Sequence, residues 1–365
     1  MSEHQQRIER AVAALGGAGV DALAVTNLVN VQYLTGYSGS NGIVVLSAAR
    51  AVLITDFRYR DAVEPLRAVL GVEILDRDIA ARVAEQLAEL APGSLRIGFE
   101  AASAPYALVE RLRPLVPAGV ELAPTEGLIE ALRLVKSATE LAATRHASDV
   151  LEVVYGRLAA GRMVGRTEID VAWEIERTIR EAGFPELSFP PIVAGGAHGA
   201  LPHAEPRNVA IERGDLVVVD IGARGVSGYC SDCTRTFAAG GPPDPAAAED
   251  YALVLSAQLA GLGAVRPGAV GGVVDATARE VIEAAGAGEL FGHGLGHGTG
   301  LEVHEGPTLR KGSEDVLVPG TLVTVEPGLY RPGRWGIRIE DHVAVTASGH
   351  EIITGFTKDL VETAG

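Results

Sequence analysis

The sequence is poor in cysteine, in positive charge and in long apolar runs. Its 365 residues include two cysteines, Cys230 and Cys233, too few for the disulfide framework of a secreted protein. No run of about 18 apolar residues occurs, so we expect no membrane span and no membrane partner. The polar start, MSEHQQRIER, lacks the apolar stretch of a signal peptide. These absences predict a cytoplasmic protein.

Basic residues are outnumbered by acidic ones, 31 to 47, which gives a formal net charge of −16. Nucleic-acid binding needs clustered lysine and arginine to neutralise phosphates, so we expect no nucleic-acid partner. The charge itself mostly favours solubility. At 47% hydrophobic and 21% charged, the chain can bury a sizeable core, and its length suits two domains or one large one.

The first third alternates short apolar runs with amphipathic stretches. The predicted strands lie at 21–26, 42–47, 51–56, 72–76 and 96–100, and the predicted helices at 79–90 and 104–116. Strands that alternate with helices predict a mixed α/β domain with helices over a sheet. Near residue 132 a long helical period begins, 132–161, which we expect to open a second domain. We place the two domains at 1–132 and 133–365.

Helix signals punctuate the second domain. Thr167, with Asp170 three residues on, comes close to a capping box and starts a helix that stops at Gly183. Asp244 is a cap followed by proline at the first helical position. A further helix is expected at 273–285. The rest of this domain is rich in glycine and in β-forming residues.

An acidic hairpin is the first segment that suggests chemistry. One apolar run ends in Asp220, turn glycines follow, and a second β-like run carries Asp232. If the two runs pair, both aspartates can project from one face at similar height. Two buried carboxylates that close repel each other unless a cation lies between them. The alternative is that the aspartates cap turns, and the hairpin alone does not decide between the two.

The two cysteines flank Asp232 with the C-x-x-C spacing of redox and zinc sites. On a strand, however, residues three apart point to opposite faces. We therefore expect neither a disulfide nor a shared zinc, and both cysteines pack as small apolar side chains.

A glycine-rich loop, 290–307, carries His293, His297 and His304. The first two have the i, i+4 spacing of zinc ligands on a helix, but the density of glycine forbids a stable helix, and the glutamate of that motif is absent. Glycine here more simply lets the backbone pass close to a site and leaves the imidazoles exposed. Three of nine histidines within twelve positions argue against scattered surface histidines.

Two glutamates lie in β-like runs. Glu326 ends an apolar run before Pro327. In the alternating run 336–346, Arg338, Glu340 and His342 share one face. For this second run, an ordinary arginine–glutamate pair on a sheet explains the pattern as well as a metal site does.

Taken in chain order, the segments VVVDIGA, YCSDCTRTF, GLGHGTG, VTVEPG and RIED resemble the two-metal peptidases of the pita-bread fold. That family includes methionine aminopeptidase, prolidase and Xaa-Pro aminopeptidase, and the resemblance covers essentially the whole chain. It implies an α+β fold, in which a smaller, creatinase-like mixed α/β domain precedes a C-terminal pita-bread catalytic domain. The metal ligands that it implies are Asp220, Asp232, His297, Glu326 and Glu340.

The resemblance also implies a chemistry. Four carboxylates and one neutral imidazole would balance two divalent ions, and the oxygen-rich set favours Mn²⁺, with Co²⁺ or Zn²⁺ as alternatives. Two such ions share a bridging water and lower its pKa. Glu326 would be both a ligand and the general base. The substrate's amino terminus would lie near Asp220, and His304 would bind the scissile carbonyl or the transition state.

Further residues match the Xaa-Pro branch of the family. LPHAEP resembles the segment whose histidine, here His203, contacts the substrate backbone. Arg338 matches an arginine that orients carboxylate ligands. His293 marks the branch, as does an N-terminal domain of about 130 residues. The segment around His198 departs from the family wording, which leaves the role of that residue open.

The resemblance favours aminopeptidase P activity, the hydrolysis of the N-terminal Xaa-Pro bond of peptides, in a homodimer. The alternative is a prolidase, which acts on Xaa-Pro dipeptides and needs a cation for the free carboxylate of proline. Arg331, Arg334 and Arg338 are candidates for that cation. A non-catalytic pita-bread binding module and a metal-independent amidinohydrolase of the creatinase type are disfavoured by the complete ligand set.

Overall fold

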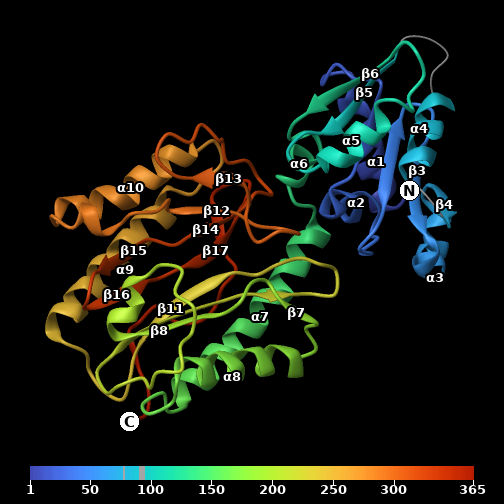
Figure 1. Cartoon of the computed structure of the whole chain (residues 1–365). Helices are drawn as coiled ribbons and strands as arrows, with labels where there is room; N and C mark the ends of the chain where they lie inside the picture. The colour runs from blue at the N-terminus through green and yellow to red at the C-terminus, as the bar shows by residue number, and fades with distance from the viewer. Residues whose placement is uncertain (77–78, 90–94) are drawn as a thin grey trace. The chain divides into compact units, whose positions relative to one another are not determined.

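The structure, a computed structural model, describes residues 1–76, 79–89 and 95–365 (Figure 1). It divides into two compact units, Met1–Arg133 and Leu134–Gly365. None of the helices in the described part of the chain combines the length and the apolarity that a membrane crossing needs.

The first unit is built on a six-stranded sheet in the order β4-β3-β2-β1-β5-β6. β2 is antiparallel to its neighbours β1 and β3, and the other pairs are parallel. The strands are β1 (Ala22–Val25), β2 (Ile43–Ser47), β3 (Ala51–Asp56), β4 (Gly71–Leu75), β5 (Leu95–Glu100) and β6 (Val120–Thr125). The helices are α1 (Glu3–Leu15), α2 (Leu28–Thr35), α3 (Arg60–Val63), α4 (Ile79–Glu89), α5 (Tyr106–Leu112) and α6 (Leu128–Arg133), with 3₁₀ turns η1 (Phe57–Tyr59) and η2 (Glu64–Ala68).

Each of the five strands predicted in this unit is confirmed to within one residue at each end. The helix predicted at 79–90 is confirmed as α4, although Leu90 lies outside the described residues. The helix predicted at 104–116 is shorter, because Pro105 precedes its first turn and Pro114 follows its last. α4 and α5 pack on one face of the sheet over Val45 and Ile97.

The second unit has two larger sheets, in the orders β19-β11-β9-β8 and β13-β12-β14-β17-β18, and two strand pairs, β10-β7 and β15-β16. Its strands are β7 (Glu186–Leu187), β8 (Ile192–Gly195), β9 (Leu216–Ile221), β10 (Ala223–Arg224), β11 (Cys233–Ala238), β12 (Gly296–Gly298), β13 (Glu305–Leu309), β14 (Leu322–Val325), β15 (Gly328–Arg331), β16 (Trp335–Arg338), β17 (Asp341–Val345), β18 (His350–Ile352) and β19 (Val361–Glu362). Its helices are α7 (Ala138–Ala160), α8 (Glu168–Glu181), α9 (Pro245–Ala264) and α10 (Gly271–Ala284), with 3₁₀ turns η3 (Gly196–Ala200) and η4 (Gly288–Leu290).

Each large sheet has its own pair of covering helices (Figure 1). α7 and α8 pack Leu151 and Ile175 against Val219 of the first sheet. α9 and α10 pack Val254 and Ala278, among others, against the second sheet. The polar side chains of the site lie on these strands or on the segments that directly join them.

Two of the predicted elements are divided in the structure. The helical period at 132–161 is not one helix, because α6 ends at Arg133 and α7 begins only at Ala138. Ser137 caps α7: its Oγ accepts from the Glu140 N–H (3.2 Å), and its own N–H donates to the Glu140 carboxylate (2.8 Å). The capping box of Thr167 and the Asp244 cap are confirmed, at the starts of α8 and α9.

The alternating run 336–346 is also two elements, β16 and β17, which belong to different sheets. Between them the Glu340 N–H donates to the Thr234 carbonyl of β11 (3.1 Å). The backbone therefore leaves one sheet and bonds to another at the residue that carries a candidate ligand.

Candidate metal centre

The acidic hairpin forms as predicted. β9 and β11 pair antiparallel, with Thr234 opposite Asp220. Asp232 directly precedes β11, two residues before Thr234, and therefore faces the same side as Asp220. Cys230 and Cys233 are buried, and both are free thiols.

Three carboxylates crowd together at this hairpin. One oxygen each from Asp220, Asp232 and Glu340 lie within 4.8 Å of one another. Burial, and then repulsion by Glu340 and Asp220, raises the pKa of Asp232 well above its ordinary value. Burial, and then the charges of Glu326 and Asp220, does the same to the pKa of Glu340. Such a group of acids is unfavourable as anions unless a cation neutralises them.

Two oxygens of the cluster have no protein partner. Asp220 Oδ1 and Glu340 Oε1 are buried and form no hydrogen bond within the described residues. A buried acceptor without a hydrogen-bond donor is energetically unfavourable. Carboxylate oxygens that are grouped in this way readily coordinate a metal ion. The donor set therefore fits a divalent cation.

His297 and Glu326 adjoin the cluster. His297 Nε2 lies 3.2 Å from Glu326 Oε1 and 3.7 Å from Asp232 Oδ2. His297 Nδ1 lies 3.1 Å from the Gly298 carbonyl, which can only accept, so Nδ1 carries a proton and Nε2 is turned toward the carboxylates. Burial opposes ionisation of Glu326, but its bond to His297 lowers its pKa to about 2.

Arg338 holds the cluster from behind. The buried guanidinium donates to Asp220 Oδ2 (2.6 Å), to Thr234 Oγ1 (3.0 Å) and to the Pro202 carbonyl (3.1 Å). It also donates to the hydroxyl of Tyr330 (2.9 Å). The Tyr330 hydroxyl lies 2.9 Å from His293 Nε2 as well, so one phenol joins the arginine to the histidine. Sequence reasoning did not single out Tyr330.

All nine residues predicted for the site line one cavity of 510 Å³. They are His203, Asp220, Asp232, His293, His297, His304, Glu326, Arg338 and Glu340. The rings of His297 and His304 are 4.4 Å apart and nearly perpendicular. Burial, and then the neighbouring His297, lowers the pKa of His304. A wall of apolar side chains completes the cavity: Phe189, Pro190, Pro191, Ile192 and Pro202.

The cavity also has a cation that sequence reasoning missed. Arg310, directly after β13, lines it and is exposed. Two of the arginines considered earlier do not line it. Arg331 pairs with Asp250, and Arg334 lies 3.8 Å from Asp244. Arg310 lies two residues beyond Thr308, another residue of the lining, and by strand alternation faces the same side, but no signal in the sequence places either residue at the cavity.

His198 lies outside the cavity lining. Its Nδ1 is 3.0 Å from both oxygens of buried Glu168, which also accepts from the N–H groups of Gly195 (3.0 Å) and Arg207 (2.8 Å). This network ties the loop between β8 and β9 to α8. Since that loop carries His203, the contribution of His198 is to the shape of the loop.

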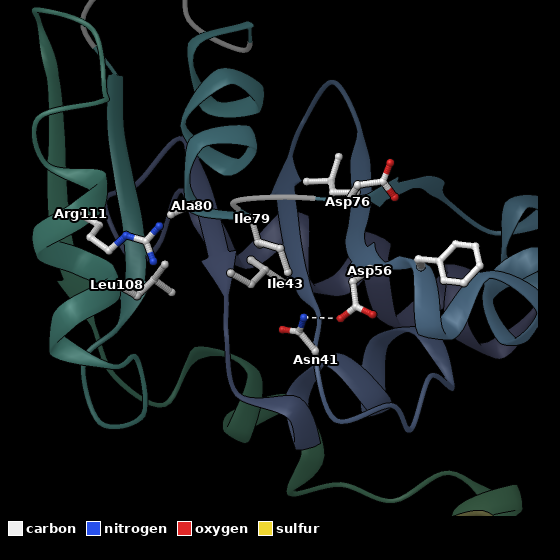
Figure 2. A pocket seen from close by; sticks show the side chains of 10 residues that line it. Asn41, Ile43, Asp56, Asp76, Ile79, Ala80, Leu108 and Arg111 are labelled. Atoms are coloured by element: carbon white, nitrogen blue, oxygen red, sulfur yellow. Dashed lines mark hydrogen bonds between the residues drawn. The ribbon is translucent and has the colours of Figure 1, made fainter.

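A second cavity, of 810 Å³, lies in the first unit (Figure 2). Apolar residues such as Ile43 and Ile79 line it together with Asp56, Asp76 and Arg111, and the described lining contains no histidine or cysteine. Asp56 accepts from Asn41 Nδ2 (2.6 Å), as Figure 2 shows, and from Arg58 Nη2 (2.8 Å). Because Asp56 already has protein partners, and no group of three potential metal ligands lies among the described residues here, this cavity is the weaker candidate for chemistry.

Two family descriptions match the chain. Metallopeptidase family M24 matches residues 141–347, and the Creatinase/Prolidase N-terminal domain matches residues 7–135. The chain belongs to metallopeptidase family M24. It is therefore a metal-dependent hydrolase of a two-metal family, and the predicted fold, a creatinase-like domain before a pita-bread domain, is confirmed.

Several relatives resemble the whole chain. The structure of the Xaa-Pro dipeptidase from Bacillus anthracis has a TM-score of 0.94 and 38% identity, and the match covers 99% of this chain and 100% of that one. The Xaa-Pro dipeptidase of Pyrococcus furiosus is 31% identical over 98% of this chain and 100% of its own. The structure of the X-Pro aminopeptidase from Thermotoga maritima has a TM-score of 0.88 and 31% identity, and it covers 98% of this chain and 100% of its own.

Proposed function

We propose that this M24 metallopeptidase is an Xaa-Pro dipeptidase, a prolidase that releases proline from the C-terminal side of a dipeptide. The observation that carries the proposal is the position of Arg310, a cation on the lining of the cavity that holds the carboxylate cluster. The expectation of aminopeptidase P activity has weaker support, because two of the three relatives described above are named dipeptidases, including the one with the highest identity to this chain.

Arg310 suits a free carboxylate. Within the described residues its side chain forms no hydrogen bond or ion pair, whereas Arg338 is committed to Asp220. A guanidinium can bind a carboxylate through two parallel hydrogen bonds. A dipeptide offers that carboxylate one residue beyond the scissile bond, and a longer peptide offers a neutral amide there. The pairing therefore favours the shorter substrate.

The apolar wall suits the proline ring. Phe189, Pro190 and Pro191 offer carbon surface and no side-chain hydrogen-bonding groups. A proline residue has no N–H to satisfy and gains from contact with such a surface. This wall supports the choice of proline as the residue after the scissile bond.

For the metal ions we propose Asp220, Asp232, His297, Glu326 and Glu340 as the ligands, all of which line the cavity. Their oxygen-rich set favours two Mn²⁺ ions, with Co²⁺ or Zn²⁺ as alternatives. When bound, two such ions supply Lewis acidity and a water that is deprotonated near neutral pH.

The side chains then have separate tasks. Glu326, ionised at neutral pH, accepts the proton of the attacking water. His304 and His203 contact the scissile carbonyl and the peptide backbone from the cavity lining. Arg338 keeps the Asp220 carboxylate oriented toward the substrate's amino terminus.

The test uses purified protein that is stripped of metal and reloaded with Mn²⁺. An Xaa-Pro dipeptide, the same dipeptide with an amidated C-terminus and an Xaa-Pro-Xaa tripeptide are compared. We expect metal-dependent cleavage of the free dipeptide and little of the other two. Equal cleavage of the tripeptide would identify aminopeptidase P activity instead, and no cleavage of any substrate would refute the enzymatic proposal.

A further inference from the structure

The segment from Phe291 to Gly298 alternates side chains with glycine: residues 292, 294, 296 and 298 are glycine. Three of these glycines face neighbouring backbone. A Cβ at Gly296 would collide with the Thr324 carbonyl, one at Gly298 with the Gly306 carbonyl, and one at Gly294 would lie 3.1 Å from the Leu309 carbonyl. A glycine-rich segment has little conformational preference of its own. Something outside the segment must therefore fix the direction of its two histidines.

An ion pair on α10 lies against this segment. Arg279 donates to both oxygens of Asp275, from Nε (2.9 Å) and from Nη2 (2.8 Å). The two side chains are 7% and 1% exposed, so the pair is shielded from water. A buried ion pair is tolerated when further hydrogen bonds satisfy its remaining donors and acceptors.

Those further hydrogen bonds go to the backbone of alternate residues. Arg279 donates to the carbonyls of Phe291 (2.9 Å) and His293 (2.8 Å). Asp275 Oδ1 accepts from the Leu295 N–H (3.0 Å). In an extended chain, the N–H and C=O groups of every second residue point to the same edge. The ion pair thus takes the place that a neighbouring strand would have, and the Arg279 guanidinium also stacks on the Phe291 ring at 4.1 Å.

The segment held in this way reaches two groups of the site. His293 makes its contact with the Tyr330 hydroxyl from here, at 2.9 Å. The Leu295 carbonyl accepts from the N–H of Glu326 (2.8 Å). A slip of the segment along α10 would therefore move His293 and loosen the backbone of Glu326 together.

We propose that Asp275 and Arg279 are positioning residues for the reaction: the pair fixes the register of the glycine–histidine segment, and thereby the orientation of His293 in the cavity. What His293 does for a substrate rests on the proposed function. The geometry that the pair imposes on His293 does not.

The variant Arg279→Lys keeps the charge and the partner but loses the planar fork, so one ammonium cannot reach both carbonyls and both carboxylate oxygens. Asp275→Asn keeps the size and removes the charge. Glu280→Gln, at an exposed position beside Arg279 on the same helix, is the matched control. Thermal unfolding verifies that each variant folds. If one of the two ion-pair variants, Arg279→Lys or Asp275→Asn, does not fold, the other still tests the proposal.

The first readout is histidine NMR on metal-stripped protein labelled at histidine. In either ion-pair variant we expect the ring signals of His293 to shift. The signals of His350, whose ring bonds to the Val265 carbonyl, should stay in place. A folded variant with unchanged His293 signals would overturn the proposal. This result does not depend on any activity, so it decides the inference even if the protein cleaves no Xaa-Pro dipeptide.

The second readout is a double-mutant cycle on the Mn²⁺-loaded enzyme. We expect Arg279→Lys to lower kcat/KM about tenfold in the natural sequence and about twofold to threefold when His293→Ala is already present, because the arginine acts mainly through that histidine and only in part through the backbone of Glu326. Equal losses in both backgrounds would show a general structural role and contradict the proposal. Failure of the dipeptide assay with shifted His293 signals would count against the proposed function alone.

Discussion

Arg338 Nη2 donates a hydrogen bond of 2.6 Å to Asp220 Oδ2, although the two residues lie on strands β16 and β9 of different sheets. The same guanidinium bonds to Tyr330 and to the Pro202 carbonyl. A candidate metal ligand, the phenol that contacts His293 and the loop that carries His203 therefore share one cation. The orientation of Asp220 depends on a fork of donors that lysine does not have.

We predict that Arg338→Lys lowers metal affinity or kcat by about 10- to 100-fold, the usual cost of losing a residue that orients metal ligands. Titration of the stripped protein with Mn²⁺ and steady-state kinetics measure the two effects. Arg334→Lys is the control, because Arg334 is exposed and lies outside the cavity lining. Full affinity and full kcat in the Arg338 variant would contradict this role.

Arg310→Gln tests the recognition of the dipeptide. Loss of a charged hydrogen bond of about 1.5–3 kcal/mol should lower kcat/KM for an Xaa-Pro dipeptide about 10- to 100-fold. The amidated dipeptide, which has no carboxylate, should be unaffected. Lys311→Gln removes a neighbouring cation that pairs with Glu283 outside the cavity and should change neither rate. An equal loss of kcat/KM for both substrates would show that Arg310 does not bind the substrate carboxylate.

Asp232→Asn tests the hairpin. The variant should lose activity and remain folded, because an amide in that place relieves repulsion from Glu340 and Asp220 in the metal-free protein. We expect its melting temperature without metal to equal or exceed that of the natural protein, and added Mn²⁺ to stabilise it far less. Full activity in this variant would show that the hairpin is not part of the active site.

Glu168→Gln tests the support of the loop that carries His203. Burial opposes ionisation of Glu168, but hydrogen bonds from Arg207 and Gly195 outweigh it and lower its pKa. A carboxyl whose pKa is lower in the folded state stabilises the fold above its ordinary pKa of about 4.3, and this stabilisation is lost as the pH falls through the folded value. The variant should lose about 3 kcal/mol at pH 7, and the difference should narrow at pH 3.

Urea unfolding at the two pH values measures that difference. Glu176→Gln, which breaks an exposed pair with Arg180, should cost at most about 0.5 kcal/mol at either pH. A Glu168 difference that stays constant between pH 7 and pH 3 would contradict the assigned cause.

Gly336→Ala tests the packing behind the site. A Cβ at this position of β16 would collide with the Gly199 carbonyl in η3. We expect a loss of about 1–3 kcal/mol and a lower melting temperature. Gly349→Ala, where nothing lies within 4 Å of the added atom, should have little effect. Equal melting temperatures for the two variants would show that the backbone at Gly199 can move aside without loss of stability.

The sequence predicted what depends on residues near in the chain. The strands of the first unit follow from short apolar runs, and the capping box at Thr167 from two residues three apart. The nine candidate site residues, which line one cavity, could be named because chemistry restricts which side chains bind metal or move protons. Where the prediction was wrong, at 132–161 and 336–346, the periodicity continued but a cap at Ser137 or a bond from Glu340 to another sheet divided the element.

What the sequence did not predict depends on tertiary neighbours. Arg331 and Arg334 seemed equal to any other arginine until the structure placed carboxylates beside them. Arg310 was overlooked because nothing in its local sequence reports the cavity. The Asp275–Arg279 pair is an ordinary i, i+4 pair on a helix by its spacing, and only the fold brings the backbone of 291–295 against it.

Gly296 and Gly298 press most closely on backbone carbonyl oxygens, those of Thr324 and Gly306. A compensating change elsewhere cannot make room for a methyl group there, since every residue type has the same carbonyl. Libraries that seek a new substrate range therefore gain nothing from varying Gly296 and Gly298, where no larger residue can be accommodated. Directed evolution of this site should therefore vary the side chains of the apolar wall and of Arg310, and leave the glycines on either side of His297 unchanged.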